Sequence, residues 1–108
     1  MAATSDIAAD EIVRRLLSAG QPERVVLFGS RARSDSGPAS DYDLLIVQKS
    51  KKPRYERAGA YYRALSSLPV EVDIVVFTPE EVEDWRSVPQ AFVTTALREG
   101  KILYERKA

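Results

Sequence analysis

The sequence predicts one small α/β domain over residues 1–108, with a mixed sheet and helices packed mainly on one face. Two observations lead to this class. Short runs rich in Val, Ile and Leu alternate along the chain with segments whose apolar residues recur every three or four positions, as strands alternating with helices do. The length suffices for a single modest hydrophobic core and leaves too little chain for a second one.

The first part of the chain is expected to contain a helix, a strand and a loop, in that order. Apolar residues from Ile7 recur at helical spacing until Gly20, which predicts an amphipathic helix of about 13 residues. The run RVVLF, residues 24–28, is apolar and β-branched, so it is expected to form a buried strand. Residues 31–40, RARSDSGPAS, have no sustained apolar period, which indicates a turn or short helix followed by a loop.

Two further strands are expected to flank a helix in the middle of the chain. The segment DYDLLIV, residues 41–47, is predicted to be the second strand, and VEVDIVVF, residues 70–77, the third. Between them, residues 55–68 are expected to form a helix with an apolar stripe that includes Tyr55 and Tyr62. Each of these two strands is interrupted by acidic residues.

A local capping signal fixes the start of the next helix. In the sequence TPEE, Thr78 occupies the N-cap, Pro79 the first helical position and Glu81 the third, which forms a capping box. This helix is expected to end near Trp85. The remaining predicted elements are a helix at about residues 89–97 and a final strand, KILYE, at residues 101–105.

The composition excludes several classes of function. The 16 basic and 16 acidic residues cancel, so the chain lacks the positive field of a non-specific nucleic-acid binder, and nucleic acid is disfavoured as the main ligand. The absence of Cys and His removes disulfides, thiolate nucleophiles, imidazole bases and the usual zinc ligands. No apolar run is long enough for a membrane span, and no signal peptide is recognisable. A soluble, cytoplasmic protein is therefore expected.

The first candidate binding feature is the Gly-Ser pair that follows the first strand. Gly29 lets the backbone turn sharply and approach a ligand, and Ser30 adds a hydroxyl donor beside the amides of the turn. Arg31 and Arg33 follow, and the guanidinium fork matches phosphate geometry. These residues indicate a phosphate site, with an ordinary turn and solvated arginines as the alternative.

Three aspartates form the second candidate feature. Alternation places Asp41 and Asp43 on one face of the second strand, and Asp73 interrupts the otherwise apolar third strand. Carboxylates on one face repel each other and lose hydration, so a fold that keeps them usually places a cation between them. Hard oxygen ligands favour Mg²⁺ or Mn²⁺. The alternative is that Asp41 caps a turn while the other two carboxylates face solvent.

These motifs together resemble a known family. The stretch GSRARSDSGPASDYDLL has a Gly-Ser pair, ten residues and then Asp-x-Asp, and with the later VEVDIVVF it closely resembles the minimal nucleotidyltransferase domains of the DNA polymerase β superfamily. The tail ALREGKILYE is also similar, and the resemblance covers residues 7–106. It implies the polymerase β-like nucleotidyltransferase fold and transfer of a nucleotide by in-line attack at the α-phosphorus of a nucleoside triphosphate.

The resemblance also implies a role for each candidate residue. Gly29 and Ser30 match the turn that holds the β- and γ-phosphates of ATP, whereas the roles of Arg31 and Arg33 beside them are less specific. The catalytic and metal-binding positions match three residues, which would hold two Mg²⁺ ions: Asp41, Asp43 and Asp73. The last of these would also help to deprotonate the attacking hydroxyl.

Relatives of this size resemble antitoxins encoded beside an all-helical HEPN ribonuclease toxin. The resemblance therefore implies an antitoxin that transfers AMP from ATP to a tyrosine of a HEPN-type toxin, as part of a homo- or hetero-oligomer. Four aromatic residues would supply a partner surface, with burial in the core as the alternative: Tyr55, Tyr61, Tyr62 and Trp85. Two other functions stay open, a non-catalytic antitoxin that neutralises its toxin by binding and an aminoglycoside-type, small-molecule nucleotidyltransferase completed by a second subunit.

Overall fold

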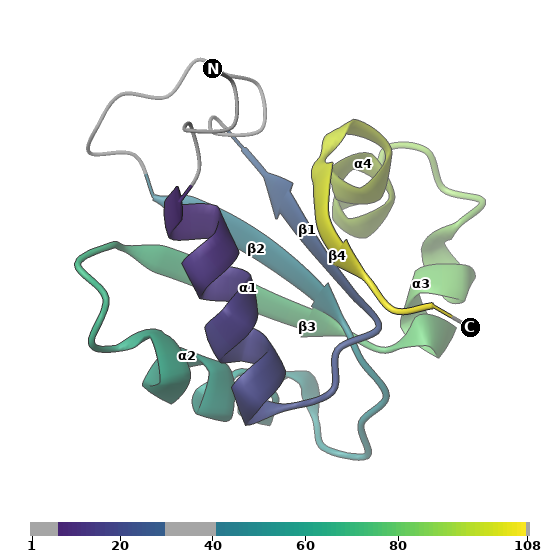
Figure 1. Ribbon diagram of the computed structural model, residues 1–108. Coiled ribbons are helices and arrows are strands. Elements are labelled where there is room, and N and C mark those ends of the chain that lie inside the picture. Colours follow the sequence, from purple (N-terminus) through teal and green to yellow (C-terminus); the bar gives the residue numbers. More distant parts are fainter. Residues whose placement is uncertain (1–6, 30–40, 108) are drawn as a thin grey trace.

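The computed structural model describes residues 7–29 and 41–107, which form a four-stranded sheet with helices against it (Figure 1). The strand order is β3-β2-β1-β4. Strand β2 runs antiparallel to β1 and parallel to β3, and β4 runs antiparallel to β1, so the sheet is mixed as expected. The elements in chain order are α1 (Ile7–Ala19), β1 (Arg24–Phe28), β2 (Tyr42–Val47), the short 3₁₀ helix η2 (Arg54–Glu56), α2 (Gly59–Leu65), β3 (Val72–Phe77), α3 (Pro79–Trp85), α4 (Phe92–Glu99) and β4 (Lys101–Glu105).

The α/β class is confirmed, but the helices are shared between both faces of the sheet rather than packed mainly on one. Helices α1 and α2 cover one face, and α4 with part of α3 covers the other (Figure 1). The reason lies in the central strands, which are apolar at nearly every position and therefore need cover on both sides. Val25 and Leu27 of β1 face α1, while Val26 between them faces α4.

The helix expected at residues 55–68 is shorter and differently oriented. It is divided into η2 and α2, and its buried positions are Tyr61 and Leu65. The predicted stripe was therefore wrong in part, because Tyr55 is 86% exposed and Tyr62 lies at the surface as well. Strand β3 is the edge strand next to this helix, and Tyr62 turns towards its backbone instead of the core.

The predicted capping box is confirmed and is joined to the rest of the fold by one arginine. The Thr78 side chain accepts from the Glu81 amide, and the Glu81 carboxylate accepts from the Thr78 amide. Arg57, whose side chain is only 7% exposed, donates to both carboxylate oxygens of Glu81 at 2.7 and 3.1 Å. It also donates to the backbone carbonyls of Lys52 and Val76, so it ties the loop after β2 to β3 and α3.

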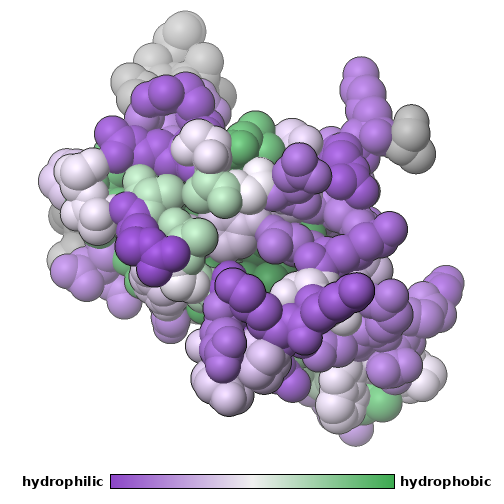
Figure 2. Space-filling model, turned by 90° about the horizontal axis from the view of Figure 1, so that it is seen from below, coloured by the Kyte–Doolittle hydropathy of each residue, from purple (hydrophilic) through white to green (hydrophobic). Residues whose placement is uncertain are grey.

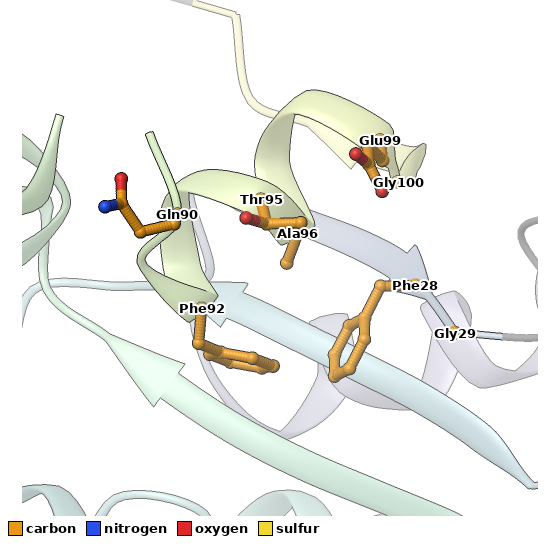
Figure 3. A pocket seen from close by; sticks show the side chains of 8 residues that line it. All are labelled: Phe28, Gly29, Gln90, Phe92, Thr95, Ala96, Glu99 and Gly100. Carbon is orange, nitrogen blue, oxygen red and sulfur yellow. The ribbon is translucent and has the colours of Figure 1, made fainter. Parts of the chain in front are cut away.

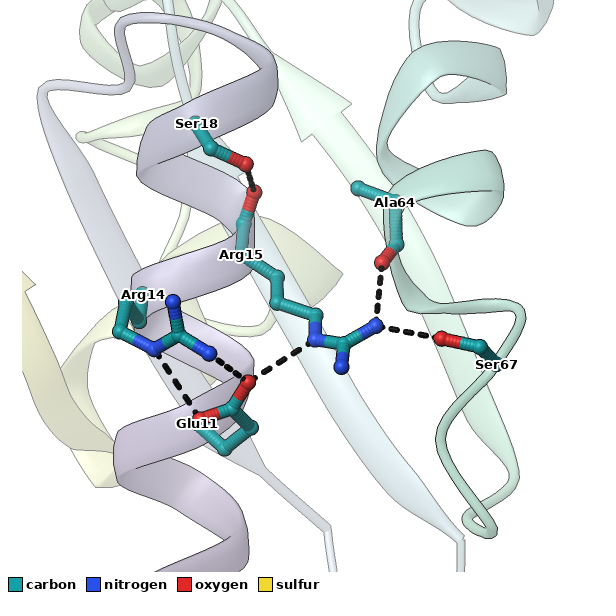
Figure 4. A network of polar contacts seen from close by, with 6 residues as sticks. All are labelled: Glu11, Arg14, Arg15, Ser18, Ala64 and Ser67. Atoms are coloured by element: carbon teal, nitrogen blue, oxygen red, sulfur yellow. Dashed lines mark hydrogen bonds and ion pairs between the residues drawn. The ribbon is translucent and has the colours of Figure 1, made fainter.

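A second polar network joins α1 to the end of α2 (Figure 4). Arg15 donates to Glu11 on its own helix at 2.9 Å, and across the helix pair to the Ala64 carbonyl and the Ser67 hydroxyl. Arg14 shares the same glutamate. Because Arg14 is exposed and Arg15 and Glu11 are only partly buried, these ion pairs contribute little to stability and mainly orient the two helices.

The molecular surface is mostly hydrophilic when seen from below, with apolar residues exposed in small areas between the charged ones (Figure 2). None of the helices in the described part of the chain combines the length and apolarity needed to cross a bilayer.

Candidate functional site

The candidate residues that the structure describes, Gly29, Asp41, Asp43 and Asp73, lie at one end of the sheet, where β1 ends and β2 and β3 begin (Figure 1). Asp43 lies directly opposite Phe28 in the β1–β2 register and directly opposite Asp73 in the β2–β3 register. Asp41 precedes β2 and is exposed. Strands β2 and β3 are therefore neighbours, and their pairing brings Asp73 beside Asp43.

Asp43 and Asp73 also lie on the same face of the sheet. Asp43 alternates with Leu45, and Asp73 with Val75 and Phe77, all of which belong to the core cluster beneath α4. Neighbouring strands are about 4.7–4.9 Å apart. The carboxylates of Asp43 and Asp73 therefore lie side by side, next to the cluster beneath α4.

The electrostatics of the site disfavour negative charge. The pKa of Asp43 is raised from its ordinary value of 3.8, first because the carboxyl group is partly buried and then because Asp73 and Asp41 lie near it. The raised pKa means that ionised Asp43 costs the folded protein free energy. A bound cation would remove this cost, so the arrangement favours cation binding over packing alone.

Gly29 brings the backbone against the Asp43 carboxylate. Its φ of 77° lies in the left-handed region that favours glycine. A Cβ at this position would collide with Oδ2 of Asp43, so any other residue would displace the carboxylate as well as strain the turn. The phosphate turn expected at Gly29 therefore begins next to the expected metal site. Its other expected members, Ser30, Arg31 and Arg33, lie outside the described residues.

Tyr62 is a site residue that the sequence did not reveal. Its hydroxyl accepts a hydrogen bond from the Ile74 amide at 2.8 Å and donates to Oδ1 of Asp73 at 3.4 Å. Because the amide of this edge strand satisfies the hydroxyl as an acceptor, the hydroxyl proton is directed to Asp73. Nothing in the local sequence distinguishes Tyr62 from the buried Tyr61 beside it, since the difference depends on how α2 sits against β3.

The carboxylates fit a Mg²⁺ ion whose remaining ligands are phosphates and waters. Within residues 7–29 and 41–107, no group of three acidic side chains forms a ready-made metal cage. Mg²⁺, however, is usually held by one or two carboxylates together with substrate phosphates and waters. Asp43 and Asp73 side by side, with Asp41 near enough to affect the Asp43 pKa, provide such a donor set beside Gly29.

Comparison with known proteins is consistent with this geometry. A family model described as "nucleotidyltransferase domain" matches residues 9–103. No curated protein matches the chain.

Three solved structures share the fold. A toxin–antitoxin crystallised with AMP-PNP is 20% identical, with a TM-score of 0.67, and the alignment covers 94% of this chain and 76% of that one. A Sulfolobus solfataricus protein described as a nucleotidyltransferase is 24% identical, with a TM-score of 0.61 and coverage of 92% and 78%. A mutant toxin–antitoxin, MntA–HpeT, with two aspartates two positions apart changed to glutamate, is 18% identical, with a TM-score of 0.64 and coverage of 94% and 75%.

Proposed function

Because this chain belongs to the nucleotidyltransferase domain family, which spans residues 9–103, we propose that it is a magnesium-dependent enzyme that transfers AMP from ATP to a protein hydroxyl group. The acceptor is a tyrosine of a partner toxin of the HEPN type, and the modification makes the chain an antitoxin. The proposal treats residues 1–108 as a single domain that acts in the cytoplasm. The observation that carries it is the pair Asp43 and Asp73 placed against the Gly29 turn.

Two of the structural relatives support the choice of substrate and partner. One toxin–antitoxin structure was obtained with AMP-PNP, an ATP analogue. In the MntA–HpeT mutant, the two changed aspartates have the same spacing as Asp41 and Asp43 here. These relatives share the fold of this chain, and the extension of their substrate and partner to it is our proposal.

In the proposed reaction the chain mainly positions its substrates and moves one proton. The Gly29–Ser30 turn holds the β- and γ-phosphates, and Asp41, Asp43 and Asp73 would hold Mg²⁺. Bound Mg²⁺ would neutralise the negative charge that develops on the attacking and leaving oxygens. The acceptor oxygen bonds to the α-phosphorus as the bond to pyrophosphate breaks, and pyrophosphate leaves.

Asp73 is placed to take the proton of the acceptor hydroxyl. Its Oδ1 accepts from Tyr62, so Oδ2 is the oxygen left for the incoming hydroxyl. The bond from Tyr62 holds the Asp73 carboxylate in one orientation and so fixes the direction in which Oδ2 points. This orientation makes the carboxylate the base of the proposed reaction.

The nucleotide and metal parts of the proposal predict a thermal shift. At ten times its Kd, Mg²⁺·ATP should stabilise the fold by about 1.4 kcal/mol, which raises Tm by roughly 5–10 °C in a domain of this size. Differential scanning fluorimetry measures this shift. EDTA should abolish most of it, and Asp43→Asn should reduce it. An equal shift with and without EDTA would contradict the metal assignment, and no shift at millimolar ATP would contradict the phosphate turn.

A further inference from the structure

A pocket of about 320 Å³ lies between the end of β1 and helix α4 (Figure 3). Phe28 and Phe92 form its apolar wall, with ring centroids 5.2 Å apart and planes at 81°. Gln90, Thr95 and Glu99 supply its polar groups along α4 and the turn before it. This space is called the Phe92 pocket below.

The Phe92 pocket adjoins the candidate site through Gly29. Gly29 lines the pocket, and a Cβ at this residue would collide with the Asp43 carboxylate. Phe28, the cross-strand partner of Asp43, points to the same face of the sheet. A ligand that has its phosphates at the Gly29 turn would therefore have the Phe92 pocket next to it.

The chemistry of the lining selects what can enter. The side chain of Phe92 is 50% exposed although it is large and apolar, so part of its ring is available to a ligand. Glu99 is a carboxylate in the pocket lining and would repel phosphate groups. The lining therefore suits a flat, uncharged group that is joined to phosphates bound at the Gly29 turn.

We propose that the Phe92 pocket holds the nucleobase of the nucleoside triphosphate substrate, stacked on the ring of Phe92. This assignment rests on the proposed nucleotidyl transfer and specifies which part of the enzyme carries the nucleoside. Stacking of a base on an aromatic side chain is tolerant of base identity. The Gln90 amide and the Glu99 carboxylate are the groups that can hydrogen-bond to the edge of the base.

The test compares ATP with a probe that has phosphates but no base. The affinities of Mg²⁺·ATP and Mg²⁺·tripolyphosphate are measured by calorimetry for the wild type and for Phe92→Leu, which keeps apolar volume and removes the flat ring. We expect Phe92→Leu to weaken ATP between about fivefold and a hundredfold and to leave tripolyphosphate unchanged. Phe92→Tyr should retain wild-type affinity for both.

Tyr55→Leu is the matched control. It makes the same kind of change at an exposed aromatic residue outside the Phe92 pocket, and it should leave both affinities unchanged. Equal weakening of both ligands by Phe92→Leu would overturn the proposal, because it would indicate general damage to the site. Unchanged ATP affinity in Phe92→Leu would also overturn it. So would an effect of Phe92→Leu on the KM for the acceptor protein alone, because the pocket would then be a binding site for the acceptor.

Failure of the nucleobase proposal can be separated from failure of the proposed function. If wild-type protein binds Mg²⁺·tripolyphosphate and ATP, and Phe92→Leu changes neither, the phosphate site stands and the pocket assignment is wrong. If the wild type binds neither ligand, the nucleotidyl transfer proposal is wrong, and the pocket assignment with it.

Discussion

Replacing Asp43 with asparagine should reduce the rate of AMP transfer by about a thousandfold or more while the protein stays folded. The side chain keeps its size but loses the charge that would hold Mg²⁺, and charge neutralisation by such an ion contributes several kcal/mol to transition-state stability. Initial rates are measured by intact-mass analysis of the acceptor with Mg²⁺·ATP. The lower rate should reflect a slower transfer step in a protein that is still folded.

The stability of the same variant supplies an internal check. Burial and the neighbouring acids raise the pKa of Asp43, so the folded protein is favoured while the carboxyl is protonated. That contribution is complete below 3.8 and is lost as pH rises through the folded pKa. Without magnesium at neutral pH, Asp43→Asn should therefore have a Tm equal to or above that of the wild type.

Asp84→Asn is the matched control for both measurements. Asp84 is an exposed acid on α3, and its replacement should change neither rate nor Tm. Transfer by Asp43→Asn at the wild-type rate would exclude Asp43 as a metal ligand. A large fall in Tm would show instead that Asp43 is a structural residue.

Arg57→Ala should destabilise the protein strongly, with a loss of about 3–5 kcal/mol in the free energy of unfolding. The change removes a nearly buried side chain and leaves Glu81 without its cationic partner. It also leaves the carbonyls of Lys52 and Val76 without the hydrogen bonds they accept from it. Denaturant unfolding measures the loss. A change below about 1 kcal/mol would show that the ion pair contributes no more than an exposed one.

Glu81→Gln is the matched variant, because glutamine can still complete the capping box while the ion pair is lost. Its expected loss is smaller than that of Arg57→Ala. The bond from Arg57 lowers the pKa of Glu81 to about 2 from 4.5, so its stabilisation is present above pH 4.5 and is lost as pH falls through about 2. In both variants the free energy of unfolding should depend less on pH between about 2 and 4.5. If Arg57→Ala kept the wild-type pH dependence in this range, Arg57 would not be the cause of the lowered Glu81 pKa.

Elements defined by local signals were predicted closely. Strand β1 and helix α3 have the expected bounds, because an apolar β-branched run and a capping box are complete within a few residues. Helix α4 begins at Phe92, later than expected, because the residues before it form a turn instead of helix. This turn is closed by a hydrogen bond from the Ala91 amide to the Val88 carbonyl, and Ala91 itself is extended. The spacing of apolar residues in a short helix does not reveal such a turn.

Features that depend on contacts between distant segments could not be predicted in the same way. The spacing of Asp41 and Asp43 was visible in the sequence, whereas the position of Asp73 opposite Asp43 required the parallel pairing of β2 with β3. Of the four aromatic residues expected at a partner surface, Tyr61 is buried and the other three are exposed. Whether a tyrosine of α2 faces the core or Asp73 is decided by helix packing across the edge strand.

The most direct test of the central claim is the intact mass of the partner. This chain is incubated with Mg²⁺·ATP and the product of the adjacent gene, the proposed partner, with the double variant Asp41→Ala, Asp43→Ala as control. We predict that the partner gains one or more AMP units with the wild type and none with the double variant. A stable complex with both versions and no gain in mass would contradict enzymatic transfer and would instead support an antitoxin that acts by binding alone.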